Sequence, residues 1–401
     1  MRLLMAVSLV LIVAVVPDGP LSTSARAGAA EATAWPTAQA ANRAIGRGVE
    51  IVSPCCDDGS GTIEGAADAA RSAGFQSVRY SVHLSTRQDP NPPHLVDPGY
   101  LTQIRVEVGV LVDRGFTVVL NNNDNLNDPD HRGDRSPILW RQVAAYFADL
   151  PPKVYFEIQN EPTWTGPFST MLTAAEWNPI VQAVIPEIRA TNPERIIVVP
   201  GGFLSIPMSV PLLQLPAGDD HLIATFHNYL PLTLTHQGAP WVPGSEAWLG
   251  TTWSATPENM AWLQDTMNLA VCWSRITGVP LFLGEFGVIS GADAASRVAW
   301  TRQVVQLAEA EHISWTYFML QHSPDFDSKL EFGIYDERTG AWDQPILDVL
   351  MARPASPIAA WATCPSGPTA TTSVPIPTTT SVPTSGANPA SPVLAQPSFT
   401  G

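Results

Sequence analysis

The sequence predicts an α/β protein with the (β/α)8 architecture of a TIM barrel. Between residues 45 and 353, eight short apolar runs alternate with segments of helical periodicity. The runs are rich in Val, Ile, Phe and Tyr, as parallel strands covered on both faces should be. An open doubly wound sheet is the alternative, but no Gly-x-Gly-x-x-Gly follows the first run. We therefore expect one barrel domain over residues 45–353.

The eight predicted strands are short runs in which apolar and β-branched residues dominate. In chain order they span residues 49–53, 77–82, 116–121, 153–159, 195–200, 221–227, 280–285 and 312–320.

Helical patterns fill most of the gaps between these runs. The predicted helices at 62–73 and 99–114 each stop before a glycine, which favours a left-handed C-cap. Ser136-Pro137 opens another helix with a cap and a first-turn proline. The link at 201–220 is Pro-rich and holds at most a short helix. Longer helices are predicted at 173–190, 256–277 and 292–311.

Residues 1–27 predict a secretory signal peptide. Arg2 precedes an apolar run at 3–16 that is too short to span a bilayer, and Ala25-Arg26-Ala27 forms a small-x-small cleavage site. An uncleaved anchor is the alternative. We expect a secreted, extracellular protein in which a lead-in, residues 28–44, precedes the barrel.

The C-terminal part of the chain changes composition. A C-terminal segment at 354–364 leads to residues 365–401, which carry no charge and are mostly Pro, Thr, Ser and Ala. Such a linker-like tail cannot bury enough apolar surface to fold, so we expect it to be disordered and extended.

The four cysteines allow three pairings. Export permits disulfides, and Cys364 could tie the C-terminus to the segment that carries Cys272. Cys55 and Cys56 are the other two. Their spacing matches no Cys/His metal motif, and we expect neither a metal nor a cofactor.

The charge balance restricts the possible partners. The net charge is -16, with 21 Lys and Arg against 37 Asp and Glu, and the basic residues form no stripe. This excludes a nucleic-acid partner and, after signal cleavage, an anionic membrane. A neutral polysaccharide is compatible. The sequence does not fix the oligomeric state, and we expect a monomer.

Two glutamates stand where predicted strands end. Asn160-Glu161-Pro162 follows the fourth strand, and Glu285 closes the seventh before Phe286-Gly287. Functional groups of a barrel gather at the carboxyl ends of its strands. Two carboxylates facing each other across a cleft can cleave a glycosidic bond if one holds a proton and the other stays charged. Glu157 alternates with apolar neighbours and is interpreted as a satisfied polar group inside the barrel.

With these residues the chain resembles family 5 of the glycoside hydrolases over about residues 45–353. That family of retaining barrel enzymes includes endoglucanases and β-mannanases. The resemblance implies that Glu161 is the acid/base and Glu285 the nucleophile. Five further positions match the family pattern and are implied to support the carboxylates or bind sugar: Arg79, Asn160, His227, Tyr229 and, as the floor of the cleft, Trp315.

Two further positions bear on sugar recognition. The family usually has a histidine after strand three, where this chain has Asn121-Asn122-Asn123-Asp124, and Asn123 is the best match. Its amide can hydrogen-bond a sugar hydroxyl but cannot titrate. The stretch from Thr235 to Trp241 resembles one in cellulase-like bacterial members, which favours Trp241 as a sugar platform.

These features predict a secreted β-glycanase that cleaves β-1,4-glucan internally, by double displacement. A β-mannanase or another β-glucan hydrolase is the alternative within the family. A non-catalytic carbohydrate-binding barrel is the alternative of a different class, although both carboxylates are present.

Overall fold

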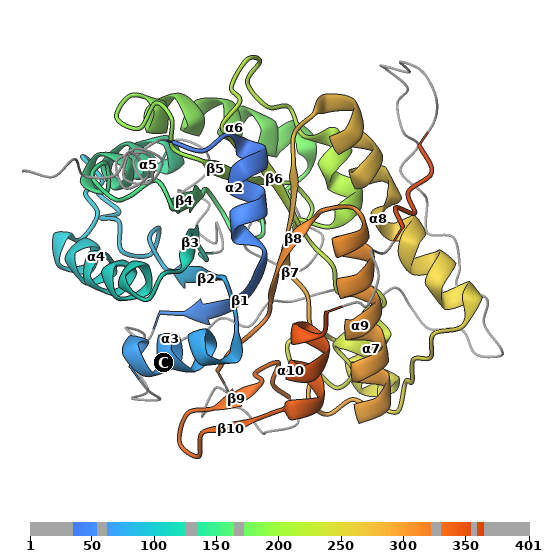
Figure 1. The fold of residues 1–401 in the computed structure, drawn as a ribbon. Helices are drawn as coiled ribbons and strands as arrows, with labels where there is room; N and C mark the ends of the chain where they lie inside the picture. Colours follow the sequence, from blue (N-terminus) through green and yellow to red (C-terminus); the bar gives the residue numbers. More distant parts are fainter. Residues whose placement is uncertain are drawn as a thin grey trace, which may run out of the picture. The chain divides into compact units, whose positions relative to one another are not determined.

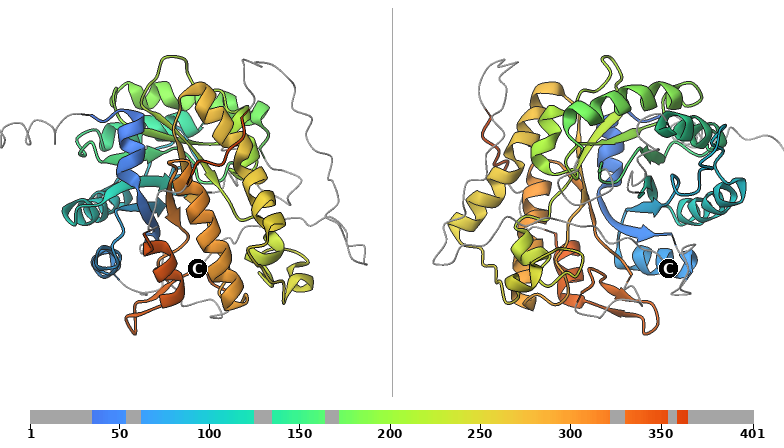
Figure 2. Two further views of the ribbon diagram at one scale, coloured as in Figure 1. Left: turned by 45° about the vertical axis from the view of Figure 1, so that its right-hand side comes forward. Right: turned by 180° about the vertical axis from the view of Figure 1, so that it is seen from behind.

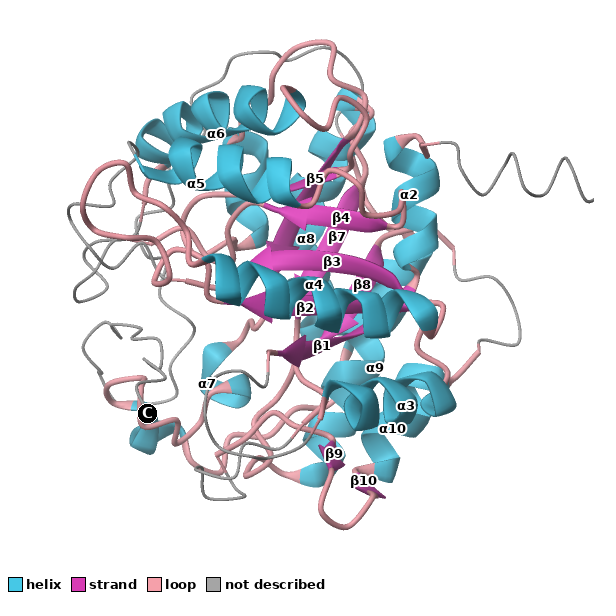
Figure 3. Ribbon diagram, turned by 90° about the vertical axis from the view of Figure 1, so that its left-hand side faces the viewer, coloured by secondary structure: helices cyan, strands magenta, loops and turns pink. Residues whose placement is uncertain are grey.

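A computed structural model describes residues 35–53, 62–124, 135–163, 172–321, 330–353 and 359–364. Eight parallel strands close into a barrel in the order in which they occur along the chain, and helices surround it (Figures 1 and 3). The predicted (β/α)8 barrel is confirmed. The strands are β1 Arg47–Val52, β2 Ser77–Val82, β3 Thr117–Asn122, β4 Val154–Glu157, β5 Ile197–Pro200, β6 Leu222–His227, β7 Leu281–Glu285 and β8 Ser314–Tyr317.

Several of the helices that follow the strands begin at side-chain caps. Thr62 accepts a hydrogen bond from the amide of Gly65, and Thr256 accepts one from Asn259. Only a short 3-10 helix, η4 Pro207–Leu212, links β5 to β6, as the Pro-rich sequence predicts. The covering helices are α3 Ile63–Ala73, α4 Pro98–Asp113, α5 Arg135–Tyr146, α6 Ala174–Arg189, α8 Pro257–Thr277 and α9 Ala294–Ala310.

The predicted lead-in at 28–44 contains a helix that the sequence analysis did not identify, α2 Ala38–Ile45. The amide of Ala38 donates to the Asp220 carbonyl, which lies just before β6. The apolar face of α2 packs on barrel-interior residues of β3 to β7, in a buried cluster separate from the main core. The helix therefore closes the amino end of the barrel, and the carboxyl end carries the candidate site.

Further elements lie in the β6–β7 connection and after β8. The first connection holds α7 Leu232–Thr235 and η5 Ser245–Trp248. After β8 come a small hairpin and a helix that packs along α9 (Figure 2). These are β9 Tyr335–Asp336, β10 Ala341–Trp342 and α10 Gln344–Met351.

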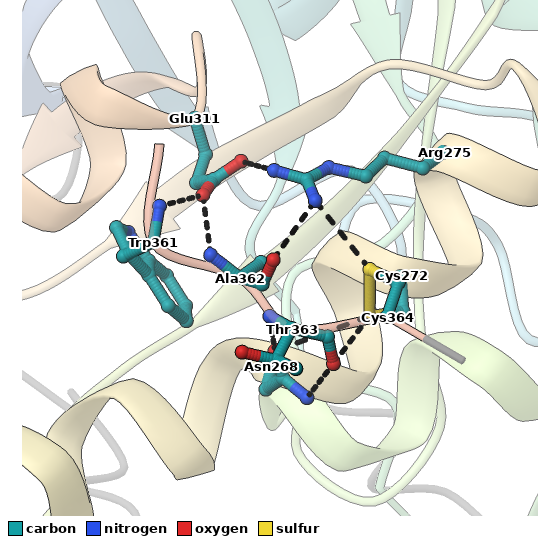
Figure 4. The surroundings of a disulfide bond; sticks show 8 residues. All are labelled: Asn268, Cys272, Arg275, Glu311, Trp361, Ala362, Thr363 and Cys364. Carbon is teal, nitrogen blue, oxygen red and sulfur yellow. Dashed lines mark hydrogen bonds and ion pairs between the residues drawn. A yellow bond between two sulfur atoms is a disulfide. The ribbon is translucent and has the colours of Figure 1, made fainter. Parts of the chain in front are cut away.

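A disulfide joins Cys272 on α8 to Cys364, which confirms the pairing that the sequence suggested (Figure 4). The segment before Cys364 lies against α8 and the end of α9. Glu311 accepts hydrogen bonds from the amides of Trp361, at 2.7 Å, and Ala362, at 2.8 Å. The last described residues are thus fixed to the barrel wall.

Several predictions fall outside the described residues. They are the signal peptide at 1–27, the tail at 365–401, and any pairing of Cys55 and Cys56. Within the described ranges, no helix combines the length and apolar character needed to cross a membrane.

Candidate active site

Arg79 on β2 organises the interior of the barrel at its carboxyl end. Its guanidinium is fully buried and donates two hydrogen bonds to the carboxylate of Glu157 on β4, from Nε at 2.7 Å and from Nη2 at 3.0 Å. Nη2 also donates to the Oδ1 atom of Asn160 at 2.7 Å. The interpretation of Glu157 as a satisfied polar group inside the barrel is confirmed. This arginine holds strands β2 and β4 and the Asn160-Glu161 segment in one arrangement.

Glu285 ends β7 and receives two strong hydrogen bonds. Nη1 of Arg79 donates to its Oε1 at 2.5 Å, and the Tyr229 hydroxyl donates to its Oε2 at 2.9 Å. Burial alone would raise the pKa of Glu285, but the charges of His227 and Arg79 together with these hydrogen bonds outweigh it and lower the pKa below its usual value. Glu285 is therefore the carboxylate that stays ionised.

Glu161 lies beyond the end of β4 in a different environment. Burial raises the pKa of its carboxyl, although the hydrogen bond and charge of His227 oppose the rise. Nδ1 of His227 lies 2.8 Å from Oε1 of Glu161. Of the two carboxyl groups, Glu161 is therefore the one that keeps its proton to the higher pH.

The ring of His227 fits because β7 has a glycine beside it. A Cβ atom on Gly284 would lie 3.1 Å from Nε2 of His227 and 2.7 Å from the Thr225 hydroxyl. The β6–β7 register shifts between Phe226 and His227, and this places His227 opposite Glu285. The small residue and the bulge together direct the imidazole toward both carboxyl groups.

The two glutamates come close to each other. One carboxylate oxygen of Glu161, one of Glu285 and a ring nitrogen of His227 all lie within 4.8 Å of one another. Carboxyl groups about 5–5.5 Å apart are typical of retaining glycosidases, whereas inverting enzymes need about 6.5–9.5 Å. The spacing thus suits direct attack by one carboxylate.

The amide side chains predicted to contact sugar lie near this pair. Asn160 is buried, and its Oδ1 is occupied by Arg79, which leaves its amide nitrogen to donate elsewhere. Asn123 follows β3 half-buried, and its backbone amide donates to the Val82 carbonyl. Sugar contact by Asn160 and Asn123 stays a prediction.

The prediction that Trp315 floors the cleft is wrong. Trp315 is fully buried, and its indole nitrogen donates to Glu309 of the outer helix α9 at 3.3 Å. Its ring packs edge-on against Phe286 with centroids 5.6 Å apart. Side chains alternate along a strand, and Trp315 has the outward orientation. The aromatic residue of the β8 end that lies near Tyr229 is Phe318, with ring centroids 6.4 Å apart.

Trp241 belongs to an aromatic group beside Tyr229. Its ring lies 6.5 Å from that of Phe332, and Phe332 in turn lies 5.8 Å from Tyr229. Trp241 is half-buried. This position is compatible with a sugar platform, which stays a prediction.

Sequence reasoning missed one member of the interior cluster, Glu50 on β1. It is fully buried, and its Oε2 accepts from Nη1 of Arg79 at 2.5 Å. The available signal was the same as for Glu157, namely one acidic residue within an apolar strand.

Two groups of side chains among the described residues could offer metal ligands. One is the Glu161, His227 and Glu285 cluster itself. The other is Asp219-Asp220-His221, where Asp219 already pairs with Arg189 at 2.7 Å. In the first cluster, the pKa values of the two glutamates shift in opposite directions, as acid/base catalysis by carboxyl groups requires. The contacts of both groups can be explained without a bound ion.

Paired carboxyl groups with opposed pKa shifts, at the carboxyl end of a (β/α)8 barrel, define a glycosidase site. Comparison with known proteins agrees. The Cellulase family, described as glycosyl hydrolase family 5, matches residues 43–323. This chain therefore belongs to glycosyl hydrolase family 5, as its motifs predicted.

Individual relatives fit this assignment. Endoglucanase H of Acetivibrio thermocellus is 27% identical over 286 residues, which cover 71% of this chain and 29% of the relative. Crystal structures of Thermotoga maritima Cel5A in complex with mannotriose match with a TM-score of 0.71 and 29% identity, over 78% of this chain and 99% of that one. A hyperthermophilic endo-beta-1,4-glucanase in complex with substrate matches with a TM-score of 0.70 and 31% identity, over 79% of this chain and 99% of that one. The chain spans less than a third of the length of Endoglucanase H.

Proposed function

We propose that this glycosidase is a secreted endo-β-1,4-glucanase that works with retention of configuration. The observation that carries the proposal is the approach of Glu161 and Glu285 oxygens to within 4.8 Å, with the pKa of Glu161 raised and that of Glu285 lowered. The names of the relatives support a β-glucan substrate.

The reaction proceeds in two displacements. In the first, an ionised oxygen of Glu285 attacks the anomeric carbon while Glu161 gives its proton to the departing glycosidic oxygen. The bond from carbon to the leaving oxygen breaks as the ester bond to Glu285 forms. In the second, Glu161 takes a proton from water, which attacks the same carbon and releases Glu285.

The surrounding side chains serve these steps. Arg79 and Tyr229 hold Glu285 in place and stabilise its charge before attack and after release. Burial raises the pKa of Tyr229, and the charge of Glu285 adds to that rise, so the phenol remains a donor. His227 contacts Glu161 through Nδ1 and can stabilise it in either protonation state.

A β-mannan is the second candidate substrate. Cel5A of Thermotoga maritima has been solved with mannotriose as well as with cellobiose, so a barrel of this kind accommodates either sugar. The discriminating experiment is a reducing-sugar assay on carboxymethyl cellulose, mixed-linkage glucan and mannan in parallel. Faster hydrolysis of mannan than of both glucans would replace the glucanase proposal with a mannanase.

Product configuration tests the mechanism independently of the substrate. Proton NMR of the first products should show the β-anomer before mutarotation. An initial α-anomer would mean single displacement, and the close approach of the two carboxyl groups would then need another explanation.

Secretion and a monomeric state are parts of the same proposal. The leader at 1–27 supports export, and the net charge of -16 opposes self-association. N-terminal sequencing of the protein from culture medium should begin near residue 28, and light scattering should give the mass of one chain. Retention of the full leader in a membrane fraction would favour the anchor instead.

A further inference from the structure

Glu50 is a buried carboxyl group that the two displacements do not use. It shares one nitrogen with the nucleophile, because Nη1 of Arg79 lies 2.5 Å from Oε2 of Glu50 and 2.5 Å from Oε1 of Glu285. On its other side, Ser81 Oγ lies 2.6 Å from Oε1 of Glu50. Asn121 donates to that hydroxyl at 2.9 Å. Glu50 therefore has polar partners on both oxygens and no contact with solvent.

The charges in this cluster do not balance if every carboxyl is ionised. One guanidinium then faces three carboxylates, on β1, β4 and β7, which are Glu50, Glu157 and Glu285. A surplus of two negative charges is costly there, because burial removes most of the water that would solvate them. Among the described residues, the other titratable groups that interact with the cluster are His227, His236, Tyr229 and Glu161. Burial lowers the pKa of His236 to about 4, so near neutral pH only His227 can add a positive charge.

The contacts indicate which of the three carboxyl groups carries a proton. Glu157 takes two parallel bonds from Arg79, the geometry that favours an ionised carboxylate. Glu285 has Tyr229 in addition to Arg79. Glu50 has a single bond from Arg79, shared with Glu285, and a serine hydroxyl that can accept as well as donate.

The electrostatics of the site agree with this ranking. Burial raises the pKa of Glu50 to about 8; the charge of Arg79 and the hydrogen bonds from Ser81 and Arg79 oppose this rise, and the charge of Glu285 reinforces it. A proton on Oε1 would face Ser81, while Oε2 continues to accept from Arg79.

We propose that Glu50 keeps its proton in the working enzyme and acts, as a neutral carboxyl, as a positioning residue. The positive charge of Arg79 then pairs only with Glu157 and the nucleophile Glu285. This inference rests on the proposed function, because it takes Glu285 as the nucleophile. When Glu50 ionises at alkaline pH, a second negative charge competes for Nη1 of Arg79. The guanidinium then shifts toward β1 and releases Glu285 from its reactive position.

The test compares Glu50→Gln with Glu50→Ala. Glutamine reproduces the neutral acid, since its oxygen can accept from Arg79 and its nitrogen can donate to Ser81. We expect kcat/KM of Glu50→Gln at pH 6 to stay within about threefold of wild type, whereas Glu50→Ala loses about tenfold or more because Arg79 loses an acceptor. Glu157→Gln is the matched control at the other interior carboxyl, and its loss should resemble that of Glu50→Ala. Far-UV circular dichroism establishes that each variant is folded.

The pH profile separates positioning from a purely structural role. The substrate is an aryl β-cellobioside with an activated leaving group, because its first displacement needs little protonation by Glu161 and kcat/KM reports that displacement. Wild type should lose activity as pH rises through about 8, and Glu50→Gln should keep it to higher pH. Identical alkaline limbs, or a loss in Glu50→Gln as large as in Glu157→Gln, would overturn the proposal.

Infrared spectroscopy gives a readout that does not depend on activity. The C=O stretch of protonated carboxyl groups should be weaker in Glu50→Gln than in wild type at pH 6, and the difference should vanish above about pH 8. An unchanged band at pH 6 would mean that Glu50 is ionised and would overturn the inference. If the cellobioside were not hydrolysed at all, the proposed function would fail, and the infrared difference would still decide the protonation of Glu50.

Discussion

Nδ1 of His227 lies 2.8 Å from Oε1 of Glu161, and the same atom lies 3.5 Å from Oε2 of Glu285. One imidazole nitrogen therefore faces both carboxyl groups of the site. Burial alone would lower the pKa of His227, but the charge of Glu285 and the hydrogen bond and charge of Glu161 outweigh it and raise the pKa above its usual value. A positive imidazole lowers the pKa of each glutamate, so it sets the pH range in which one is protonated and the other is not.

Replacing His227 should move the whole pH profile toward alkaline pH. In His227→Gln, loss of the positive charge raises the pKa of Glu285, which sets the acid limb, and that of Glu161, which sets the alkaline limb. Both limbs of kcat/KM against pH should shift upward. His236→Gln is the matched control, because burial lowers the pKa of His236 to about 4 and its loss removes no charge near neutral pH. A shift of one limb alone would contradict the shared role of the imidazole.

The two glutamates should respond differently to substitution. Glu285→Gln should abolish turnover of every substrate, because no other group can form the glycosyl ester. Glu161→Ala should cost about 10²–10⁴-fold on cellulose and less on aryl glycosides with activated leaving groups, which need little protonation. Steady-state kinetics on both substrate types check this.

Azide rescue tests the same assignment. Azide should restore Glu161→Ala by attacking the glycosyl-enzyme and should give a glycosyl azide with retained configuration. Rescue of a Glu285 variant with retention would show that the two roles are reversed.

The sequence predicts the barrel well because each strand is an apolar run bounded by helical periodicity. Glu161 and Glu285 can be recognised in the sequence for a related reason, because each is a carboxylate at the end of an apolar run. The apolar character of the strands also means that the sequence does not predict the orientation of Trp315. Strands covered on both faces are apolar on both, so the sequence does not show which residues point inward.

Long-range contacts explain the other omissions. Helix α2, with 8 residues, is too short to be stable alone and derives its stability from packing on the barrel, although Thr37 caps it and its buried residues recur at helical spacing. Glu50 is an isolated acid in the sequence. Its partner Arg79 lies 29 residues away and Glu285 lies 206 residues from Arg79, so only the closed barrel brings the three together.

The positions of two tryptophans predict opposite consequences. Trp315→Ala should lower the free energy of unfolding by about 3–5 kcal/mol, because it empties a fully buried site. Its kcat at low temperature should stay near that of wild type, since the ring faces α9. Trp241→Ala should cost less stability than Trp315→Ala, because its ring is only half-buried, and should raise KM on polymeric glucan, as loss of a remote contact does. Urea denaturation gives the stability of both variants, and steady-state kinetics gives their kcat and KM. An unchanged KM in folded Trp241→Ala would mean that Trp241 only packs in its loop and does not bind sugar.

The Cys272–Cys364 disulfide should contribute to stability and the tail should not. The bond closes a loop with a sequence separation of 92, for which the loss of chain entropy in the unfolded state corresponds to about 4–5 kcal/mol as an upper limit. Cys364→Ser should lower Tm, and a reductant should lower the Tm of wild type by more than that of this variant. Deletion of residues 366–401, which keeps Cys364, should change neither Tm nor kinetics on soluble substrates. A large fall of Tm on deletion would mean that the tail packs on the barrel, contrary to what its composition predicts.

Buried acids should make the protein less stable as pH rises. The unfolded pKa of Glu50 is near 4.5 and its folded pKa is about 8, so between these values the folded state binds a proton that the unfolded state has lost. Stability from this group is fully present below about pH 4.5 and falls by roughly 1.4 kcal/mol per pH unit until about pH 8. The raised pKa of Glu161 acts in the same direction.

Glu50→Gln isolates the contribution of Glu50 to this dependence. The glutamine cannot ionise in the folded or the unfolded state, so the variant should gain stability relative to wild type as pH rises from 5 to 8. The pH dependence of stability that Glu161 causes is the same in both proteins and cancels in the comparison. Urea denaturation at pH 5, 6.5 and 8 gives the difference directly. We expect the variant to be less stable than wild type, or equal to it, at pH 5 and clearly more stable at pH 8. A difference that does not change with pH would mean that Glu50 has the same protonation in the folded and unfolded protein, and the charge imbalance around Arg79 would then have to be relieved at Glu157 or Glu285.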